Sequence, residues 1–172
     1  MNATFFGQQE IRSGYQALFW YIFLVDNSSG PSDKLFDDFL SSQSFGVFCQ
    51  PFIKKRTRGQ NVRFLESAFN QEALEISKFR KLTREDLLNF LSDYANSEDW
   101  GDDREGFTAI LNEFEKPLRQ ESAPFFFLIS NEWFKKEDNL LSADAEIYIY
   151  FMLIIWFDAD KRILNVCQWS YD

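Results

Sequence analysis

The stretch EIYIYFMLIIWF at 146–157, followed by DADK at 158–161 and RILNVCQWS at 162–170, decides the fold class. Side chains alternate between the two faces of a strand, and in the first stretch both faces are apolar. A strand of this kind lies at the centre of a sheet, with both sides covered at least in part. The polar turn predicts a C-terminal β-hairpin. We expect the face with Tyr148 and Tyr150 to meet water or a partner.

Four segments before this hairpin have apolar residues at the i, i+3, i+4 spacing of helices. Each also carries a residue type that caps or ends a helix. The predicted helices are 33–41 with Ser32 as its cap, 71–79 capped by Asn70, a helix from Thr83 to Tyr94, and 104–116, which Pro117 ends.

Further strands are expected in the remaining apolar segments. Residues 125–130 form a short apolar run between Pro124 and a polar residue, which indicates a strand. Residues 47–55 and 61–66 are expected to pair as a hairpin, because Gly59 between them favours a tight turn.

Residues 8–25 leave both a helix and a strand open. The length of the segment favours a helix, whereas Gly14 and the bulky aromatic residues favour a strand. We predict a helix. Together the elements predict a single α+β domain over 1–172, with a mixed or antiparallel sheet that includes the C-terminal β-hairpin and packs against about four to five helices.

The chain has no histidine and only two cysteines, Cys49 and Cys167. The lack of histidine removes the usual general base near neutral pH, the histidine-activated nucleophiles and the commonest transition-metal ligand. Two cysteines outside a CxxC pattern cannot form a Cys₄ zinc site, and we expect both to be reduced thiols. The sequence therefore predicts neither a metal nor a cofactor.

The longest apolar runs, at 17–25 and 147–157, are shorter than the roughly 20 residues that a membrane-spanning helix needs. The first run also lacks the flanks and the cleavage site of a signal peptide. We therefore expect no membrane association and a cytoplasmic location.

Charge is divided unevenly along the chain. Residues 85–121 contain eleven acids and three bases, which is a net charge of −8 in a chain whose total is −9. Residues 54–84 contain nine bases and three acids. Such dense negative charge repels itself, so it requires either internal compensation or a basic partner.

The densest carboxylates lie in SEDWGDDREG at 97–106. One interpretation is a solvated loop between two helices, in which an aspartate caps the second helix. A calcium site fits poorly, because the spacing differs from that of an EF-hand loop. The third interpretation is a recognition surface, in which acids surround aromatic anchors and attract a cationic partner. Its predicted partner-binding residues are Asp93, Tyr94, Glu98, Asp99, Trp100, Asp102, Asp103 and Glu105.

The basic run KKRTR at 54–58 lies in the predicted hairpin of the first half. Residues 54–63 either compensate the acidic helices or bind phosphate, and the sequence leaves both open. Because the net charge of −9 opposes contact with nucleic acid elsewhere, we expect no direct nucleic-acid partner.

Phosphate-binding glycine loops, nucleophile elbows and zincin helices do not occur in the sequence. We therefore predict a non-enzymatic protein that binds, and inhibits, a basic protein such as a nuclease, a toxin or a nucleic-acid-binding enzyme. Immunity proteins and phage-encoded inhibitors are of this physical type.

Two alternatives stay open. The first is a structural or assembly subunit that contacts a neighbouring chain through Tyr148, Tyr150 and Trp156. The second is a carboxylate-dependent hydrolase, which needs two acids across a cleft, drawn from 93–105 or from the Asp-x-Asp at 158–160. The oligomeric state is not predicted.

Overall fold

The computed structural model describes residues 2–26, 31–49, 53–55, 63–65, 67–97, 103–134, 139–142, 145 and 148–171. Six strands form one sheet in the order β1-β2-β8-β7-β6-β5, and all neighbours are antiparallel. These strands are β1 (Ala3–Ser13), β2 (Gln16–Val25), β5 (Arg80–Leu82), β6 (Phe125–Ile129), β7 (Tyr150–Asp158) and β8 (Ile163–Tyr171). A second, two-stranded sheet contains β3 (Ile53–Lys55) and β4 (Arg63–Leu65).

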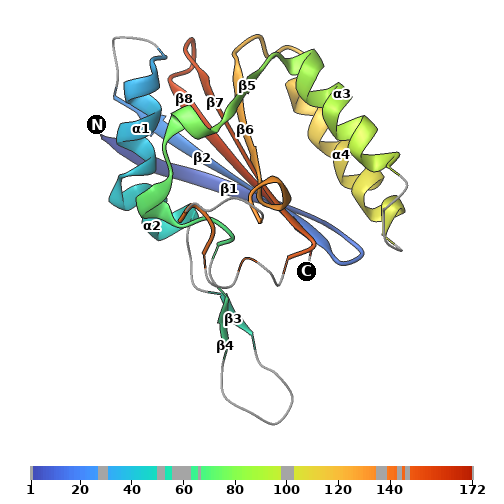
Figure 1. Ribbon diagram of the computed structural model, residues 1–172. Helices are drawn as coiled ribbons and strands as arrows, with labels where there is room; N and C mark the ends of the chain where they lie inside the picture. Colours follow the sequence, from blue (N-terminus) through green and yellow to red (C-terminus); the bar gives the residue numbers. More distant parts are fainter. Residues whose placement is uncertain are drawn as a thin grey trace.

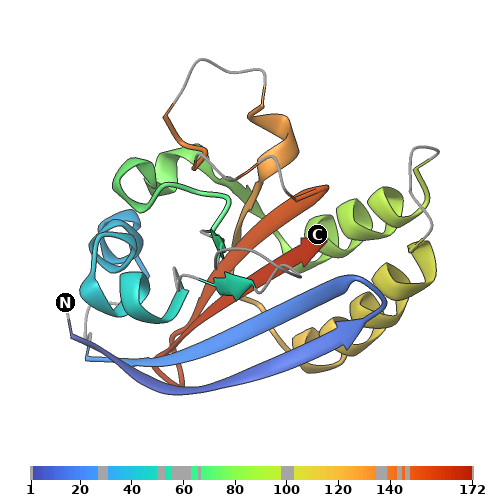
Figure 2. The ribbon, with the colours of Figure 1, turned by 90° about the horizontal axis from the view of Figure 1, so that it is seen from below.

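Helices cover both faces of the large sheet. The described residues form α1 (Asp33–Leu40), α2 (Gln43–Cys49), α3 (Arg84–Ala95) and α4 (Arg104–Leu118), with the short 3₁₀ helices η1 (Gln71–Ala73), η2 (Ile76–Lys78) and η3 (Ser130–Glu132). α1 and α2 lie on one side of the sheet, and α3 and α4 lie on the other (Figures 1 and 2). The predicted α+β class is confirmed, and the sheet is antiparallel.

The strand β7 occupies the central position that its two apolar faces predict. It pairs with β6 on one side and with β8 on the other, and β7 and β8 form the predicted C-terminal hairpin. Alternate residues of β7 enter the core under α1 and α2, namely Phe151, Leu153, Ile155 and Phe157. The others enter the core under α3 and α4, namely Tyr150, Met152, Ile154 and Trp156.

The tyrosine face of this strand does not meet water or a partner, contrary to expectation. Tyr150 is 0% exposed and Trp156 is 1% exposed, because α3 and α4 cover them. Tyr148 lies before the start of β7 and is also buried, in the other core. Tyr148, Tyr150 and Trp156 are therefore not exposed to a neighbouring chain, as the alternative function of a structural or assembly subunit requires.

Capping residues begin α1 and α3 where the sequence predicts. The Ser32 hydroxyl accepts a hydrogen bond from the backbone N–H of Leu35, at 3.2 Å. At α3 the Thr83 hydroxyl accepts from the N–H of Asp86, and the Asp86 carboxylate accepts from the N–H of Thr83. This reciprocal capping box satisfies backbone donors that a helix start leaves free.

The predicted helix over residues 8–25 is wrong, because this segment is the β1–β2 hairpin. Gly14 and Tyr15 form its two-residue turn, in which Gly14 has a φ of +58° that favours glycine. β2 lies between β1 and β8, and side chains on both of its faces are buried along most of its length. A strand buried on both faces lacks the alternation that marks a half-exposed strand.

Two other predictions are corrected in part. Residues 71–79 form the short helices η1 and η2 in place of one α-helix, although Asn70 does cap the first through its side chain. The predicted strand 47–55 is divided between the end of α2 and β3, but the pairing of β3 with β4 confirms a hairpin. α4 ends at Leu118, one residue after Pro117.

Aromatic side chains fill the core between the sheet and the pair α3 and α4. Phe107 stacks on Trp169 with ring centroids 4.2 Å apart. Phe114 lies 6.0 Å from Trp20 and 6.4 Å from both Trp156 and Trp169 between centroids. Within the described part of the chain, no helix combines the length and the apolar character that crossing a membrane requires.

Replacing Phe114 by alanine tests this core. Phe114 is fully buried, so the change leaves a cavity among three tryptophans and is expected to lower the free energy of unfolding by about 3–5 kcal/mol. Urea unfolding followed by tryptophan fluorescence measures the loss. Asn112→Ala, on the exposed side of the same helix, is the control and should change it by less than about 0.5 kcal/mol. Equal effects would contradict this description of the core.

Candidate functional site

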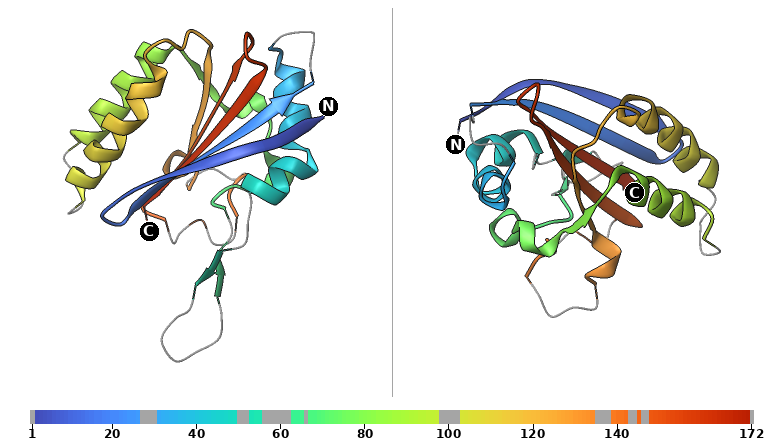
Figure 3. Two further views of the ribbon diagram at one scale, coloured as in Figure 1. Left: turned by 180° about the vertical axis from the view of Figure 1, so that it is seen from behind. Right: turned by 90° about the horizontal axis from the view of Figure 1, so that it is seen from above.

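The acidic segment 85–121 contains most of the helix pair α3 and α4. The two helices run in opposite directions along one face of the sheet (Figures 1 and 3). Their inner sides are held by apolar residues at helical spacing, which are Leu87, Leu91, Phe107, Ile110, Phe114 and Leu118. The charged residues of both helices are consequently left on the outer side.

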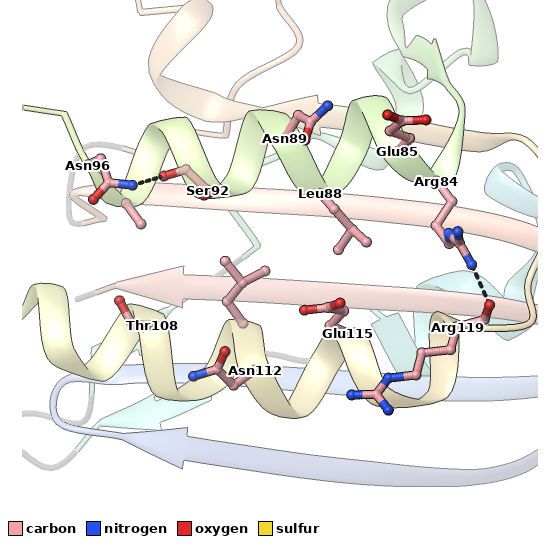
Figure 4. Close-up of a pocket in the computed structure, with 12 residues that line it drawn as sticks. Arg84, Glu85, Leu88, Asn89, Ser92, Asn96, Thr108, Asn112, Glu115 and Arg119 are labelled. Atoms are coloured by element: carbon pink, nitrogen blue, oxygen red, sulfur yellow. Dashed lines mark hydrogen bonds between the residues drawn. The ribbon is translucent and has the colours of Figure 1, made fainter.

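An open groove of about 750 Å³ runs between the outer sides of these two helices (Figure 4). Seven residues of α3 and its cap and five residues of α4 and its cap line it: Arg84, Glu85, Leu88, Asn89, Ser92, Ala95, Asn96, Thr108, Leu111, Asn112, Glu115 and Arg119. Leu88 and Leu111 are half-buried, and the exposed amides and hydroxyls lie mainly toward the Asn96 end.

Charged side chains gather at the opposite end of the groove, where the guanidinium of Arg84 donates to the backbone carbonyl of Arg119. Glu85 and Glu115 lie near them, so the lining itself holds two acids and two bases. The lining includes no cysteine and no tyrosine. It therefore offers hydrogen bonds and charge to a ligand.

Four carboxylates on the outer side of the helix pair are exposed and lack an ion pair with another described residue: Glu85, Asp93, Glu105 and Glu115. We call these four residues the free carboxylates. By contrast, Glu113 pairs with Lys116 at 2.6 Å.

Asp103, a predicted partner-binding residue, is engaged within the molecule. Its carboxylate accepts from the backbone N–H of Tyr15 at 2.9 Å and from the side-chain amide of Gln16 at 3.3 Å. Its backbone carbonyl accepts from the same amide at 2.7 Å. Gly14 and Gly106 flank the carboxylate so closely that a Cβ at either position would clash with it. Asp103 thus fastens the turn of the β1–β2 hairpin to the start of α4.

Gln16 connects Asp103 to the core of the protein. This residue is not among the site residues predicted from the sequence. It is 1% exposed, and its side-chain oxygen accepts from the hydroxyl of Tyr150 and from the indole N–H of Trp169 at 3.3 Å. Burial raises the pKa of Tyr150, so this hydroxyl stays protonated and donates. The only local signal for Gln16 is its position directly after a glycine-containing turn.

Tyr94 is half-buried and contributes to the core more than to the surface. Its ring lies 5.8 Å from Phe107 and 5.5 Å from Tyr150 between centroids, and its hydroxyl accepts from the amide of Asn131 at 3.1 Å. Burial raises the pKa of Tyr94 above its ordinary value. Of the predicted surface, the structure thus leaves Asp93 and Glu105 exposed and places Tyr94 and Asp103 in internal contacts.

The other predicted site residues, Glu98, Asp99, Trp100 and Asp102, lie outside the described residues, as does most of the basic run 54–63. The backbone of β3 and β4 lies apart from α3 and α4 (Figure 1). The ion pairs of the described residues include none between these two regions. Both earlier explanations of the basic run stay predictions.

Asp158, which the sequence offers as a candidate for carboxylate catalysis, stabilises the turn after β7. It accepts from the backbone N–H of Lys161 at 3.0 Å and pairs with its ammonium at 2.6 Å. Partial burial raises the pKa of Asp158, but these contacts with Lys161 outweigh it and lower the pKa below its ordinary value. In the described part of the chain, no three His, Cys, Asp or Glu residues are arranged to hold a metal ion.

Both cysteines are buried free thiols, as predicted. Burial raises the pKa of Cys49 and of Cys167, which keeps both thiols protonated and unreactive near neutral pH. Neither thiol is therefore a candidate nucleophile.

Comparison of the chain with models of protein families, with curated proteins and with solved structures finds no match.

Changing Asp103 to alanine tests its role as a fastening residue. The change removes the acceptor for the Tyr15 N–H and one contact of the buried Gln16 amide, and is expected to cost about 1–3 kcal/mol of unfolding free energy. Glu105→Ala, two residues along and exposed, is the control. Urea unfolding gives the free energies, and amide exchange at Tyr15 should accelerate in the first variant only. An unchanged exchange rate would contradict the role.

Proposed function

We propose that the outer side of α3 and α4 binds a basic macromolecular partner and inhibits it without chemistry of its own. The observation that carries this proposal is the set of four free carboxylates, Glu85, Asp93, Glu105 and Glu115, on one helix pair. Exposed charges of one sign repel one another, and a cationic surface relieves this repulsion. A partner with clustered Lys or Arg side chains fits this requirement.

The class of partner follows from where such clusters occur. Nucleases and other nucleic-acid-binding enzymes line their substrate groove with Lys and Arg, because these residues neutralise phosphates. A protein that places carboxylates against those side chains excludes the nucleic acid by occupying its contacts. Carboxylates at an interface rim mainly accelerate association, since they attract the partner before contact.

The groove between the helices would supply the short-range part of the interaction. Asn89, Asn96 and Asn112 offer both donors and acceptors, and the half-buried Leu88 and Leu111 offer apolar area between them. Such contacts determine how long a complex lasts, whereas the surrounding charge determines how fast it forms.

Neutralising the free carboxylates tests the proposal. The test variant carries Glu85→Gln, Asp93→Asn, Glu105→Gln and Glu115→Gln. The control carries the same number of changes at exposed acids elsewhere, Asp26→Asn, Asp33→Asn, Glu72→Gln and Asp160→Asn. Both variants have the same net charge, so a difference in binding between them is due to the position of the neutralised carboxylates. Thermal unfolding confirms that both are folded.

The measurement begins with capture of proteins from a lysate of the native host by the immobilised chain, followed by purification of each captured protein. We expect a basic partner whose association rate falls about tenfold or more when the salt concentration rises from 0.05 to 0.5 M, because the Debye length shrinks from about 14 to about 4 Å. The test variant should show a similar loss at low salt, and the control should not. Equal binding by both variants, or inhibition that persists in the test variant, would contradict the proposal.

A further inference from the structure

The outermost strand β1 has a free edge along half of its length. β1 is the border of the large sheet, and no described strand pairs with its outer edge. Its first residues are covered by α2, because the Ser44 hydroxyl donates to the carbonyl of Ala3 at 2.9 Å and Phe48 stacks on Phe5 at 4.1 Å. Beyond Phe6 this cover ends.

The hairpin geometry shows which backbone groups point away from the molecule. Residues that flank a two-residue turn exchange both of their hydrogen bonds, and bonded pairs then alternate with unbonded pairs along the strands. Ser13 and Gln16 flank the turn, so the N–H and C=O groups of Gln8, Glu10 and Arg12 point outward. The same alternation explains why the outward carbonyl of Ala3 is available to Ser44.

A bulge limits the free edge at its other end. The register between β1 and β2 shifts between Phe5 and Gly7, which leaves Phe6 as the extra residue and 67% exposed. Bulges bend a strand and interrupt pairing. The usable edge therefore extends from Gln8 to Arg12, where three outward donors and three outward acceptors have no hydrogen-bond partner among the described residues.

We propose that this edge pairs with the same edge of a second copy of the chain, in an antiparallel register centred on Ile11. The charges on this edge identify a second copy of the chain as the partner. Glu10 and Arg12 are the charged residues of the free edge, and they lie on the same face of the strand, where their side chains form an ion pair. In the proposed register, Glu10 of each copy lies opposite Arg12 of the other.

Other registers place like charges opposite each other or leave the charged residues without an opposite charge. An axis through Glu10 places two glutamates directly opposite each other, and an axis through Arg12 does the same with two arginines, which is destabilising. An axis through Gln9 places Arg12 opposite the bulge at Phe6, so that neither Glu10 nor Arg12 faces a residue of opposite charge. The axis through Ile11 places each charge opposite its counter-charge and pairs the outward backbone groups of Glu10 with those of Arg12, while Gln8 lies opposite Gly14 of the turn.

Pairing of this kind joins the two large sheets into one continuous antiparallel sheet. The Ile11 side chains, which pack on the core under α4, meet across the axis as an unbonded pair, where side chains lie closest. This inference concerns a different surface from the acidic helix pair and does not depend on the proposed function.

Charge reversal at two positions tests the pairing and its register. Sedimentation of the whole chain over a range of concentrations should show a species of twice 20.4 kDa at the higher ones. Glu10→Arg and Arg12→Glu each place like charges opposite one another in a homodimer, and each should weaken it about tenfold or more. An equimolar mixture of the two variants should restore dimers, because every Glu then faces an Arg of the other chain.

The mixture separates pairing between chains from the ion pair within a chain, since that inner pair is lost in both variants. Ile11→Cys adds a second test: its thiols meet at the axis and should cross-link under mild oxidation, whereas the thiols of Gln9→Cys should not. Thermal unfolding checks that all variants fold. A chain that stays monomeric at about 1 mM, or dimers that survive in both single charge variants, would overturn the proposal, as would binding of a strand from another protein to β1 without self-association.

Discussion

The burial of β7 on both faces is the constraint on which the rest of the structure depends. No residue from Tyr150 to Phe157 provides a polar face, so the strand is stable only with a layer of helices on each side. α1 and α2 supply one layer and α3 and α4 supply the other. At about 25 cal/mol per Å² of apolar area, removing either layer would expose several large aromatic residues and cost more than the net stability of an ordinary domain.

The acidic surface follows from this constraint. Because the inner sides of α3 and α4 must cover β7 and β8, the many carboxylates of residues 85–121 are confined to their outer sides and ends. A capping box at Thr83 and the Glu113–Lys116 pair use some of this negative charge locally. The free carboxylates make no ion pair with another described residue, and the proposal that they serve recognition rests on this.

Sequence patterns predict the elements whose signals are local in the chain. They do not predict the elements and side-chain contacts that depend on residues distant in the sequence. β7, the capped starts of α1 and α3, and the β7–β8 turn are recognisable from the sequence. The sequence of β2 predicts a helix because a strand buried on both faces loses its alternation of polar and apolar residues, and the predicted helix 8–25 also includes part of its partner β1. The sequence places Asp103 on the surface because its partners, Tyr15 and Gln16, are 88 and 87 residues away in the chain. No spacing in the sequence indicates that Gly14 and Gly106 flank one carboxylate.

The two border strands of the large sheet, β5 and β1, differ in length and in how much of each is covered. Pairing through the uncovered border strand would also determine where the free carboxylates lie in a dimer. β5 has three residues and leads directly into α3, whereas β1 has eleven and is covered by α2 only at its start. Antiparallel pairing of two β1 edges relates the copies by an axis perpendicular to the sheet, so both α3–α4 pairs lie on the same side of the joined sheet. Such a dimer presents two sets of free carboxylates to a partner that is itself dimeric or has two basic regions. The second contact would then form at a high effective concentration, which strengthens binding without any new kind of contact.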